Sequence, residues 1–182
     1  QKKISFIGVK NLKLTIFASS SDDSKQLLTG VNFTFNLKYL ESAATDGHRL
    51  AVVLVDKKDN FDEKDDLVSD EENLSVTIPT RSLREIEKLV SLKTSENSIK
   101  LFYDKGQVVF ISSNQIITTR TLEGSYPNYP QLIPENFTKL FKFNTKKIIE
   151  SLERIAVLAD QQSSVVKIKL EEKDLALVSA DA

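Results

Sequence analysis

The residues best able to do chemistry stand together in one short stretch, Ala44-Thr45-Asp46-Gly47-His48-Arg49-Leu50-Ala51. Asp46, His48 and Arg49 bring a carboxylate, an imidazole and a guanidinium within four residues, and His48 is the only histidine of the chain. Acid–base catalysis is the first chemistry that such a set suggests. Asp-Gly between two apolar runs is also the strongest short-range signal of a β-hairpin, because glycine accepts a positive φ. The plainer interpretation is therefore a turn in which Asp46 caps the backbone while His48 and Arg49 face water.

A catalytic role would need a nucleophile beside His48, the only available base. The sequence holds no Gly-x-Ser-x-Gly elbow and no loop typical of an oxyanion hole. Carboxylate-pair hydrolysis in the acidic segment 56–73 is the other conceivable chemistry, but that segment has no apolar frame to shift a pKa. With no cysteine and one histidine, a structural zinc site and thiolate chemistry are excluded. We expect a non-catalytic protein with no metal and no cofactor.

The composition is that of an ordinary globular protein, with 40% hydrophobic and 28% charged residues in 182. No apolar run approaches the ~20 residues of a membrane span, no signal peptide opens the chain, and the lack of cysteine fits a cytoplasmic setting. Nine carboxylates and three lysines lie in 56–73, whereas the rest holds 22 basic and 17 acidic residues. That mildly basic body is compatible with a polyanionic partner. The acidic segment lacks the glycine of an EF-hand loop, so a solvated loop is expected there.

Hydrophobic periodicity and turn residues predict the elements that must position the opening stretch. Strands are expected over 4–6, 26–35, 37–44, 50–55, 74–78, 99–103, 107–112, 115–122, 140–143, 164–170 and 175–180. Helices are expected over 9–19, over 81–92 with Thr80 as N-cap, and over 145–159 with Asn144 as N-cap. Three prolines between 124 and 134 argue against both a helix and a central strand and predict an extended arm that holds two tyrosines.

The expected helix over 81–92 separates its apolar and basic side chains. At 100° per residue, Arg81, Arg84 and Lys88 form a stripe on one side. The opposite, broad face carries the apolar residues Leu83, Ile86, Leu89 and Val90. A charged outer face usually serves solvation alone, so this helix by itself does not establish a partner.

An internal repeat links the two ends of the chain. Three apolar residues recur at an offset of 135: Val31, Phe33 and Phe35 match Val166, Ile168 and Leu170. At the same offset 39–46 matches 174–181, so the order strand-helix-strand-strand occurs twice. A period of this length indicates duplicated domains rather than a solenoid. We expect one complete domain over 1–135 and the first third of another over 136–182, which cannot close its core alone, so that further residues follow Ala182 in the intact protein.

The stretch 44–51 resembles the signature of the bacterial DNA polymerase III β subunit, the sliding clamp. Segments 27–31, 77–79 and 122–129 resemble the same family in the same order. The resemblance covers nearly the whole chain and corresponds to the family's middle domain and the start of its third. It implies an α+β DNA-clamp fold, in which repeated domains each have two helices packed on antiparallel sheets. It also implies a non-catalytic processivity factor of the replicative DNA polymerase.

Clamps of this family are head-to-tail homodimers of three-domain subunits whose helices line a ring around duplex DNA. The implied partners are double-stranded DNA bound independently of sequence, a second copy of the chain, and the replicative polymerase, clamp loader and repair proteins, which bind through short peptides. Basic side chains facing the pore would attract phosphates without reading bases. The matching residues are Lys10, Lys13, Lys25, Arg81, Arg84, Lys88, Lys146, Lys147 and Arg154.

The resemblance also implies a pocket between the middle and third domains for a partner peptide carrying Gln and apolar anchors. The matching positions are Leu28, Thr45, Gly47, His48, Arg49, Leu50, Pro127, Gln131 and Leu132. Four of them would supply an apolar slot: Leu28, Leu50, Pro127 and Leu132. A β-rich protein-interaction module without a DNA role is the alternative, and assembly into a ring distinguishes the two.

Overall fold

The structure is a computed structural model that describes residues 2–7, 9–36, 38–56, 74–91, 98–112, 115–137, 140–159, 165–171 and 175–180. The chain divides into two compact units, Gln1–Leu132 and Ile133–Ala182, and each is described by itself. Beyond Asp56, the acidic loop expected over 56–73 lies outside the described residues. Within the described ranges, no helix has both the length and the hydrophobicity that crossing a bilayer requires.

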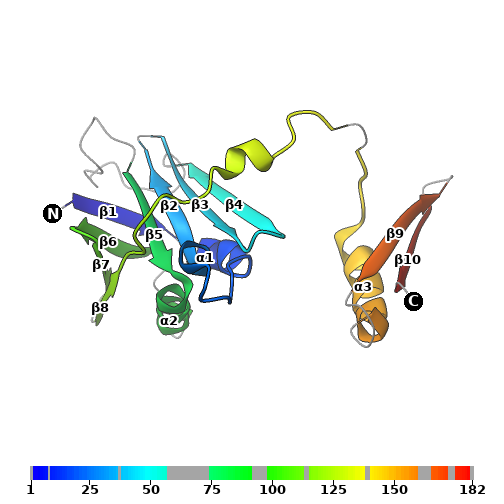
Figure 1. The fold of residues 1–182 in the computed structure, drawn as a ribbon. Coiled ribbons are helices and arrows are strands. Elements are labelled where there is room, and N and C mark those ends of the chain that lie inside the picture. Colours follow the sequence, from blue (N-terminus) through cyan, green and yellow to red (C-terminus); the bar gives the residue numbers. More distant parts are fainter. Residues whose placement is uncertain are drawn as a thin grey trace. The chain divides into compact units, whose positions relative to one another are not determined.

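The described residues of the first unit form two antiparallel sheets and two α-helices (Figure 1). Its elements, in chain order, are β1 (Lys2–Ile7), α1 (Val9–Ile16), the 3-10 helix η1 (Gln26–Thr29), β2 (Gly30–Phe35), β3 (Tyr39–Thr45), β4 (Leu50–Asp56), β5 (Leu74–Pro79), α2 (Thr80–Ser91), β6 (Ser98–Asp104), β7 (Gln107–Ser112), β8 (Gln115–Arg120) and the 3-10 helix η2 (Tyr129–Leu132). The strand orders are β1-β6-β7-β8 and β4-β3-β2-β5. α1 packs against β3 and β4, and α2 packs against β5 and β2.

The core lies between the helices and one face of the β4-β3-β2-β5 sheet. Alternate residues of β2, namely Val31, Phe33 and Phe35, are almost completely buried, as period-two alternation predicts. The helices supply Leu12, Ile16, Leu83 and Ile86, and β6 and β7 add Leu101 and Phe110. Burying each such side chain contributes about 1.5–3 kcal/mol. The apolar face expected for α2 is confirmed at Leu83 and Ile86, whereas the side chains of Leu89 and Val90 lie outside the described residues.

Two predicted boundaries in the first unit are wrong by more than two residues. α1 ends at Ile16 rather than Ser19, because the amides of Ala18 and Ser19 bond to carbonyls three residues back and tighten the chain into a turn. Residues 26–29 form a 3-10 helix rather than the start of a strand. Alternation of apolar and polar residues begins only at Val31, so the pattern that supported a strand does not extend to Gln26.

Thr80 is not the N-cap of α2. It is already the first helical residue, and its buried Oγ1 has no hydrogen-bond partner in the described part of the chain. Residues 123–128 form neither a helix nor a strand, as the prolines predicted, but η2 forms one 3-10 turn after them. Pro130 is compatible with this turn because a proline early in a helical turn has no amide to lose.

The second unit packs α3 (Thr145–Ala159) against a hairpin of β9 (Val166–Glu171) and β10 (Leu175–Ala180). The expected N-cap is confirmed, since Asn144 Oδ1 accepts the amide hydrogen of Lys147 at 3.1 Å. The strand expected over 140–143 is wrong. A strand needs a hydrogen-bonded neighbour, and among the described residues of this unit β9 and β10 pair only with each other. The matching segment of the first unit, β1, is a strand because it is paired with β6.

The strand registers refine the internal repeat. Phe33 pairs with Ser42 in the first unit, and its counterpart Ile168 pairs with Val178 in the second. Ser42 and Val178 are 136 residues apart, one more than the offset that relates Phe33 to Ile168. The paired residues are thus ten positions apart in the second unit and nine apart in the first, so the single offset of 135 does not relate both strands of the repeat.

Candidate functional site

The stretch 44–51 folds as the predicted hairpin, with Thr45 and Leu50 as its last pair and four residues in the loop. Oδ1 of Asp46 accepts the backbone amides of His48 and Arg49 at 2.9 and 3.0 Å, and Gly47 adopts a φ of +95°. These two backbone bonds, first that of His48, hold the pKa of Asp46 below its usual value, with a further contribution from the Arg49 charge. Because His48 offers its amide to Asp46, the carboxylate serves as a turn cap, as the plainer interpretation predicted.

Thr45 and Arg49 close the base of this loop. Thr45 Oγ1 donates to the carbonyl of Arg49 at 2.6 Å and accepts the amide of Gly47 at 3.1 Å. Arg49 Nε donates to Asp46 Oδ2 at 3.0 Å, and its guanidinium lies 5.7 Å from the ring centroid of Phe17. The Arg49 side chain is nevertheless 58% exposed. It is thus oriented by a carboxylate and an aromatic ring while it stays accessible to a partner.

The arm, defined as residues 121–132, runs from the end of β8 across the β4-β3-β2-β5 sheet (Figure 1). At its start, the amides of Thr121 and Leu122 donate to the carbonyls of Gly106 and Thr77. Further along, Gly124 has a φ of +119° and lies so close to Leu27 that an added Cβ would be 2.9 Å from Leu27 Cδ1. The arm is thereby seated against both sheets and against η1.

Two tyrosines of the arm reach β3. The hydroxyl of Tyr126 accepts the amide of Thr45 at 3.1 Å, and the hydroxyl of Tyr129 donates to the carboxylate of Glu41. Their rings meet edge to face, with centroids 6.3 Å apart. Burial raises the pKa of Tyr126, and burial followed by the Glu41 carboxylate raises the pKa of Tyr129. Both phenols are therefore neutral at physiological pH.

The structure brings together most, but not all, of the nine residues predicted for a peptide pocket. Five of them form the hairpin loop and its base: Thr45, Gly47, His48, Arg49 and Leu50. Pro127 follows Tyr126, which is bonded to Thr45, and Leu28 in η1 is half-buried next to the Leu27–Gly124 contact. Gln131 and Leu132 are exposed on η2, and in the described part of the chain no hydrogen bond or ion pair joins them to the hairpin.

A cavity of about 960 Å³ lies between the arm and the polar face of the sheet, and of the nine predicted residues it is lined by Pro127 alone. Its floor is a hydrogen-bonded row in which the Asn32 amide donates to the hydroxyls of Ser75 and Thr77 at 3.0 and 3.1 Å. Sequence reasoning singled out the two arm tyrosines but not Glu41, for which no local signal exists because its partner is 88 residues away.

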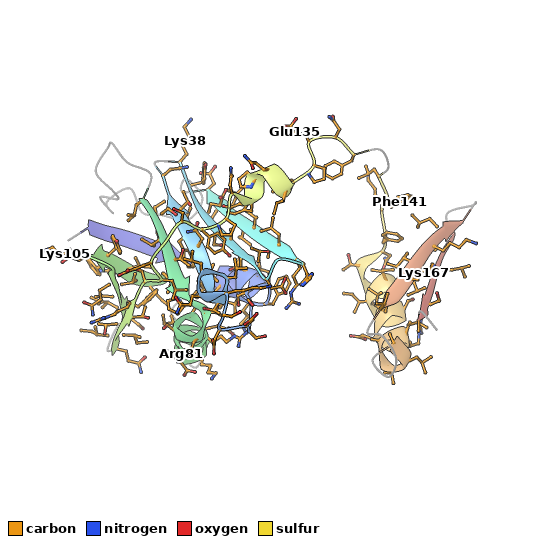
Figure 2. The ribbon with its side chains drawn as sticks, in the orientation of Figure 1. Lys38, Arg81, Lys105, Glu135, Phe141 and Lys167 are labelled. Atoms are coloured by element: carbon orange, nitrogen blue, oxygen red, sulfur yellow. The ribbon has the colours of Figure 1, made fainter. Side chains whose placement is uncertain are left out.

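The basic side chains of α2 border a second cavity of about 590 Å³, formed with residues 19–21, Asp23 and Thr29. Arg81 and Arg84 line it and are exposed, and no described carboxylate forms an ion pair with either (Figure 2 labels Arg81). The predicted stripe is partly neutralised, since Lys88 pairs with Glu85 at 2.9 Å. Lys13 of α1, also predicted to face DNA, pairs with Glu87 at 3.2 Å. Exposed pairs of this kind contribute little stability, about 0–1 kcal/mol.

The remaining predicted basic residues are spread over other elements. Lys25 precedes η1 and lies near the carboxylate of Asp22. On α3, Lys146, Lys147 and Arg154 are exposed. The side chain of Lys10 on α1 lies outside the described residues. Within the described ranges, no three His, Cys, Asp or Glu side chains gather as a metal site would require.

Comparison with known proteins agrees with this geometry. The family model described as "DNA polymerase III beta subunit, central domain" matches residues 9–128, and that of the "C-terminal domain" matches residues 130–182. The Beta sliding clamp of Synechococcus elongatus is 42% identical over 172 residues, which cover 94% of this chain and 44% of that protein. The Beta sliding clamp of Synechocystis sp. is 42% identical over 164 residues, or 89% of this chain and 42% of that protein.

A solved DNA polymerase III beta chain from Streptococcus pneumoniae superposes with a TM-score of 0.78 at 31% identity, over 96% of this chain and 45% of that one. The paired helices, the antiparallel sheets and these matches define a protein of the DNA-clamp fold, so the predicted α+β fold class is confirmed. The chain belongs to the DNA polymerase III beta subunit family. It spans about 44% of the length of the Synechococcus relative.

Proposed function

We propose that the intact protein is the processivity factor of a replicative DNA polymerase, a cytoplasmic, non-catalytic sliding clamp that encircles duplex DNA. The observation that carries this proposal is the match of two successive clamp domains along nearly the whole chain. In this proposal residues 1–135 form the middle domain and residues 136–182 form the first third of the following one. Two intact chains close a head-to-tail ring, and neither a metal nor a cofactor takes part.

The basic residues of the helices provide the proposed DNA contact. Arg81 and Arg84 support it best, because both are exposed, border one cavity and are free of ion pairs with the described carboxylates. The seven others proposed to face DNA are Lys10, Lys13, Lys25, Lys88, Lys146, Lys147 and Arg154. Cations on long, mobile side chains attract phosphates without reading base edges, and a protein that must slide requires this.

A salt series on the intact protein tests the DNA contact. Replacing both arginines, Arg81→Gln and Arg84→Gln, removes about two phosphate contacts, so the slope of log K against log salt flattens by about 1.8, since each contact contributes about 0.9. Lys38→Gln is the matched control, because Figure 2 places Lys38 and Arg81 at opposite ends of the first unit. Equal slopes for the arginine variant and the control would contradict the proposed DNA-facing surface.

The hairpin and the arm provide the proposed peptide pocket, through which the polymerase, the clamp loader and repair proteins bind. Its proposed residues are Leu28, Thr45, Gly47, His48, Arg49, Leu50, Pro127, Gln131 and Leu132. The exposed but oriented Arg49 supports this role, since a side chain held by Asp46 and Phe17 loses less conformational entropy on binding.

Substitution of the pocket separates binding from assembly. We expect Arg49→Ala and Leu50→Ala in the intact protein to abolish binding of a Gln-containing partner peptide while the dimeric ring persists, measured by fluorescence anisotropy and by light scattering. Loss of the ring in these variants would return the hairpin to a purely structural role. A wild-type protein that binds such peptides but never forms a ring would favour a β-rich interaction module instead.

A further inference from the structure

β3 continues beyond the point where β2 leaves it. The pairing of β2 with β3 ends at Asn32 and Ala43, whereas β3 runs on to Thr45, which still pairs with Leu50 of β4. The amide of Thr45 therefore lies past the last β2 pair, at a residue that is 6% exposed. A buried strand amide needs an acceptor, because an unpaired one is costly.

The arm supplies that acceptor through Tyr126, whose hydroxyl lies 3.1 Å from the Thr45 nitrogen. Tyr129 makes a second connection to the same strand through Glu41, four residues before Thr45 and on the same face. Both tyrosines also line the cavity of about 960 Å³ under the arm. Over this span two hydrogen bonds and the buried ring of Tyr129 hold the arm to the sheet beside this cavity.

These contacts lie where the proposed peptide pocket needs precision. Thr45 is the base of the hairpin loop that carries Arg49, and Pro127 is the neighbour of Tyr126 in the chain. The Tyr126–Thr45 bond thus joins the two walls of the pocket, the hairpin and the arm, at a single point. Loss of this bond would free one wall to move relative to the other. Small displacements of this kind weaken binding at sites that need exact spacing.

We propose that Tyr126 is a positioning residue of the peptide pocket, whose hydroxyl holds the arm against the hairpin through the amide of Thr45. The Tyr129–Glu41 hydrogen bond is the second anchor of the arm on β3. This inference rests on the proposed function, because it assumes that the hairpin and the arm receive a peptide. The positioning role depends on the hydroxyl oxygen of Tyr126 alone, because Tyr126→Phe would keep the ring contact with Tyr129 and lose only the acceptor of the Thr45 amide.

The test compares Tyr126→Phe with Tyr103→Phe in the intact protein. Tyr103 on β6 lines the same cavity and is half-buried, so the control variant also removes one phenolic hydroxyl, but one that lies on another strand than the hairpin. The dissociation constant of a fluorescent synthetic peptide with one Gln and two leucines is measured by anisotropy. The rate at which the Thr45 amide hydrogen exchanges with solvent deuterium is measured in the same variants. Tyr129→Phe serves as a second variant, for which a weakening of the same direction is expected.

For Tyr126→Phe we expect the peptide dissociation constant to rise about three- to tenfold, the range that one net hydrogen bond supports. The Thr45 amide should exchange faster, and Tyr103→Phe should change neither quantity. Unchanged affinity in Tyr126→Phe, or an equal loss in Tyr103→Phe, would overturn the positioning role while leaving the peptide pocket intact. A wild-type protein that does not bind the peptide would instead overturn the pocket and, with it, this inference.

Discussion

Replacing Gly124 by alanine tests how the arm is seated. Gly124 has a φ of +119°, and an added Cβ would lie 2.9 Å from Leu27 Cδ1. Gly47 in the hairpin offers a matched control, because its φ is +95° but an added Cβ would meet nothing within 4 Å. Comparison of Gly124→Ala with Gly47→Ala therefore separates the loss of stability caused by a strained backbone from the loss caused by a steric contact.

The two costs can be estimated. A non-glycine residue at such a φ costs roughly 1–3 kcal/mol, and this applies to Gly47→Ala and Gly124→Ala alike. Overpacking costs about 1–3 kcal/mol more, and the lower end applies at Gly124 because the contacted atom is the end of a half-buried leucine side chain. We expect Gly124→Ala to lower the free energy of unfolding by about 1 kcal/mol more than Gly47→Ala does.

Urea unfolding of the intact protein measures the difference, and a double-mutant cycle with Leu27→Ala assigns it. Removing the Leu27 side chain should bring the cost of Gly124→Ala down to that of Gly47→Ala. Equal costs for the two glycine variants in the wild-type background would refute the steric part of this reasoning. So would a cost of Gly124→Ala that Leu27→Ala leaves unchanged.

Three further predictions concern titration and helix capping. The folded-state pKa of Asp46 is lowered, so its contribution to stability is present above pH 3.8 and is lost as pH falls through the folded pKa. Asp46→Asn should therefore reduce the loss of stability at acid pH, measured by urea unfolding over a pH series. The pKa of Tyr129 is raised, so its contribution is full below pH 10 and is lost as pH rises through the folded value; Tyr129→Phe should make alkaline unfolding less steep, and an unchanged alkaline limb would contradict the Glu41 contact. Asn144→Ala should cost about 0.5–2 kcal/mol of helix stability, seen as faster amide exchange in the first turn of α3, whereas unaltered exchange would deny the cap.

Local patterns in the sequence predicted those features whose causes are local. Asp-Gly between apolar runs predicted the hairpin, the position of Asn144 predicted the cap of α3, and helical spacing predicted the buried face of α2 at Leu83 and Ile86. Each depends on residues within about four positions of one another, where side-chain direction follows from the backbone. The family resemblance then supplied the fold that joins these elements.

The features that the sequence did not predict depend on residues far apart in the chain. Lys13 of α1, which was predicted to face DNA, pairs with Glu87 of α2, and a helical wheel of either helix alone does not show this contact. The segment 140–143 has strand-like residues, but pairing decides whether a strand forms. Glu41 gave no signal because its acceptor role depends on Tyr129, which the fold brings to it.

The most direct test of the central claim is retention of the intact protein on DNA of different topology. The protein is loaded by its clamp loader onto nicked circular DNA and separated from free protein by gel filtration. The DNA is then linearised with a restriction enzyme. A ring that encircles the duplex stays on the circle at high salt and slides off the linear ends. Equal retention on circular and linear DNA would contradict the clamp.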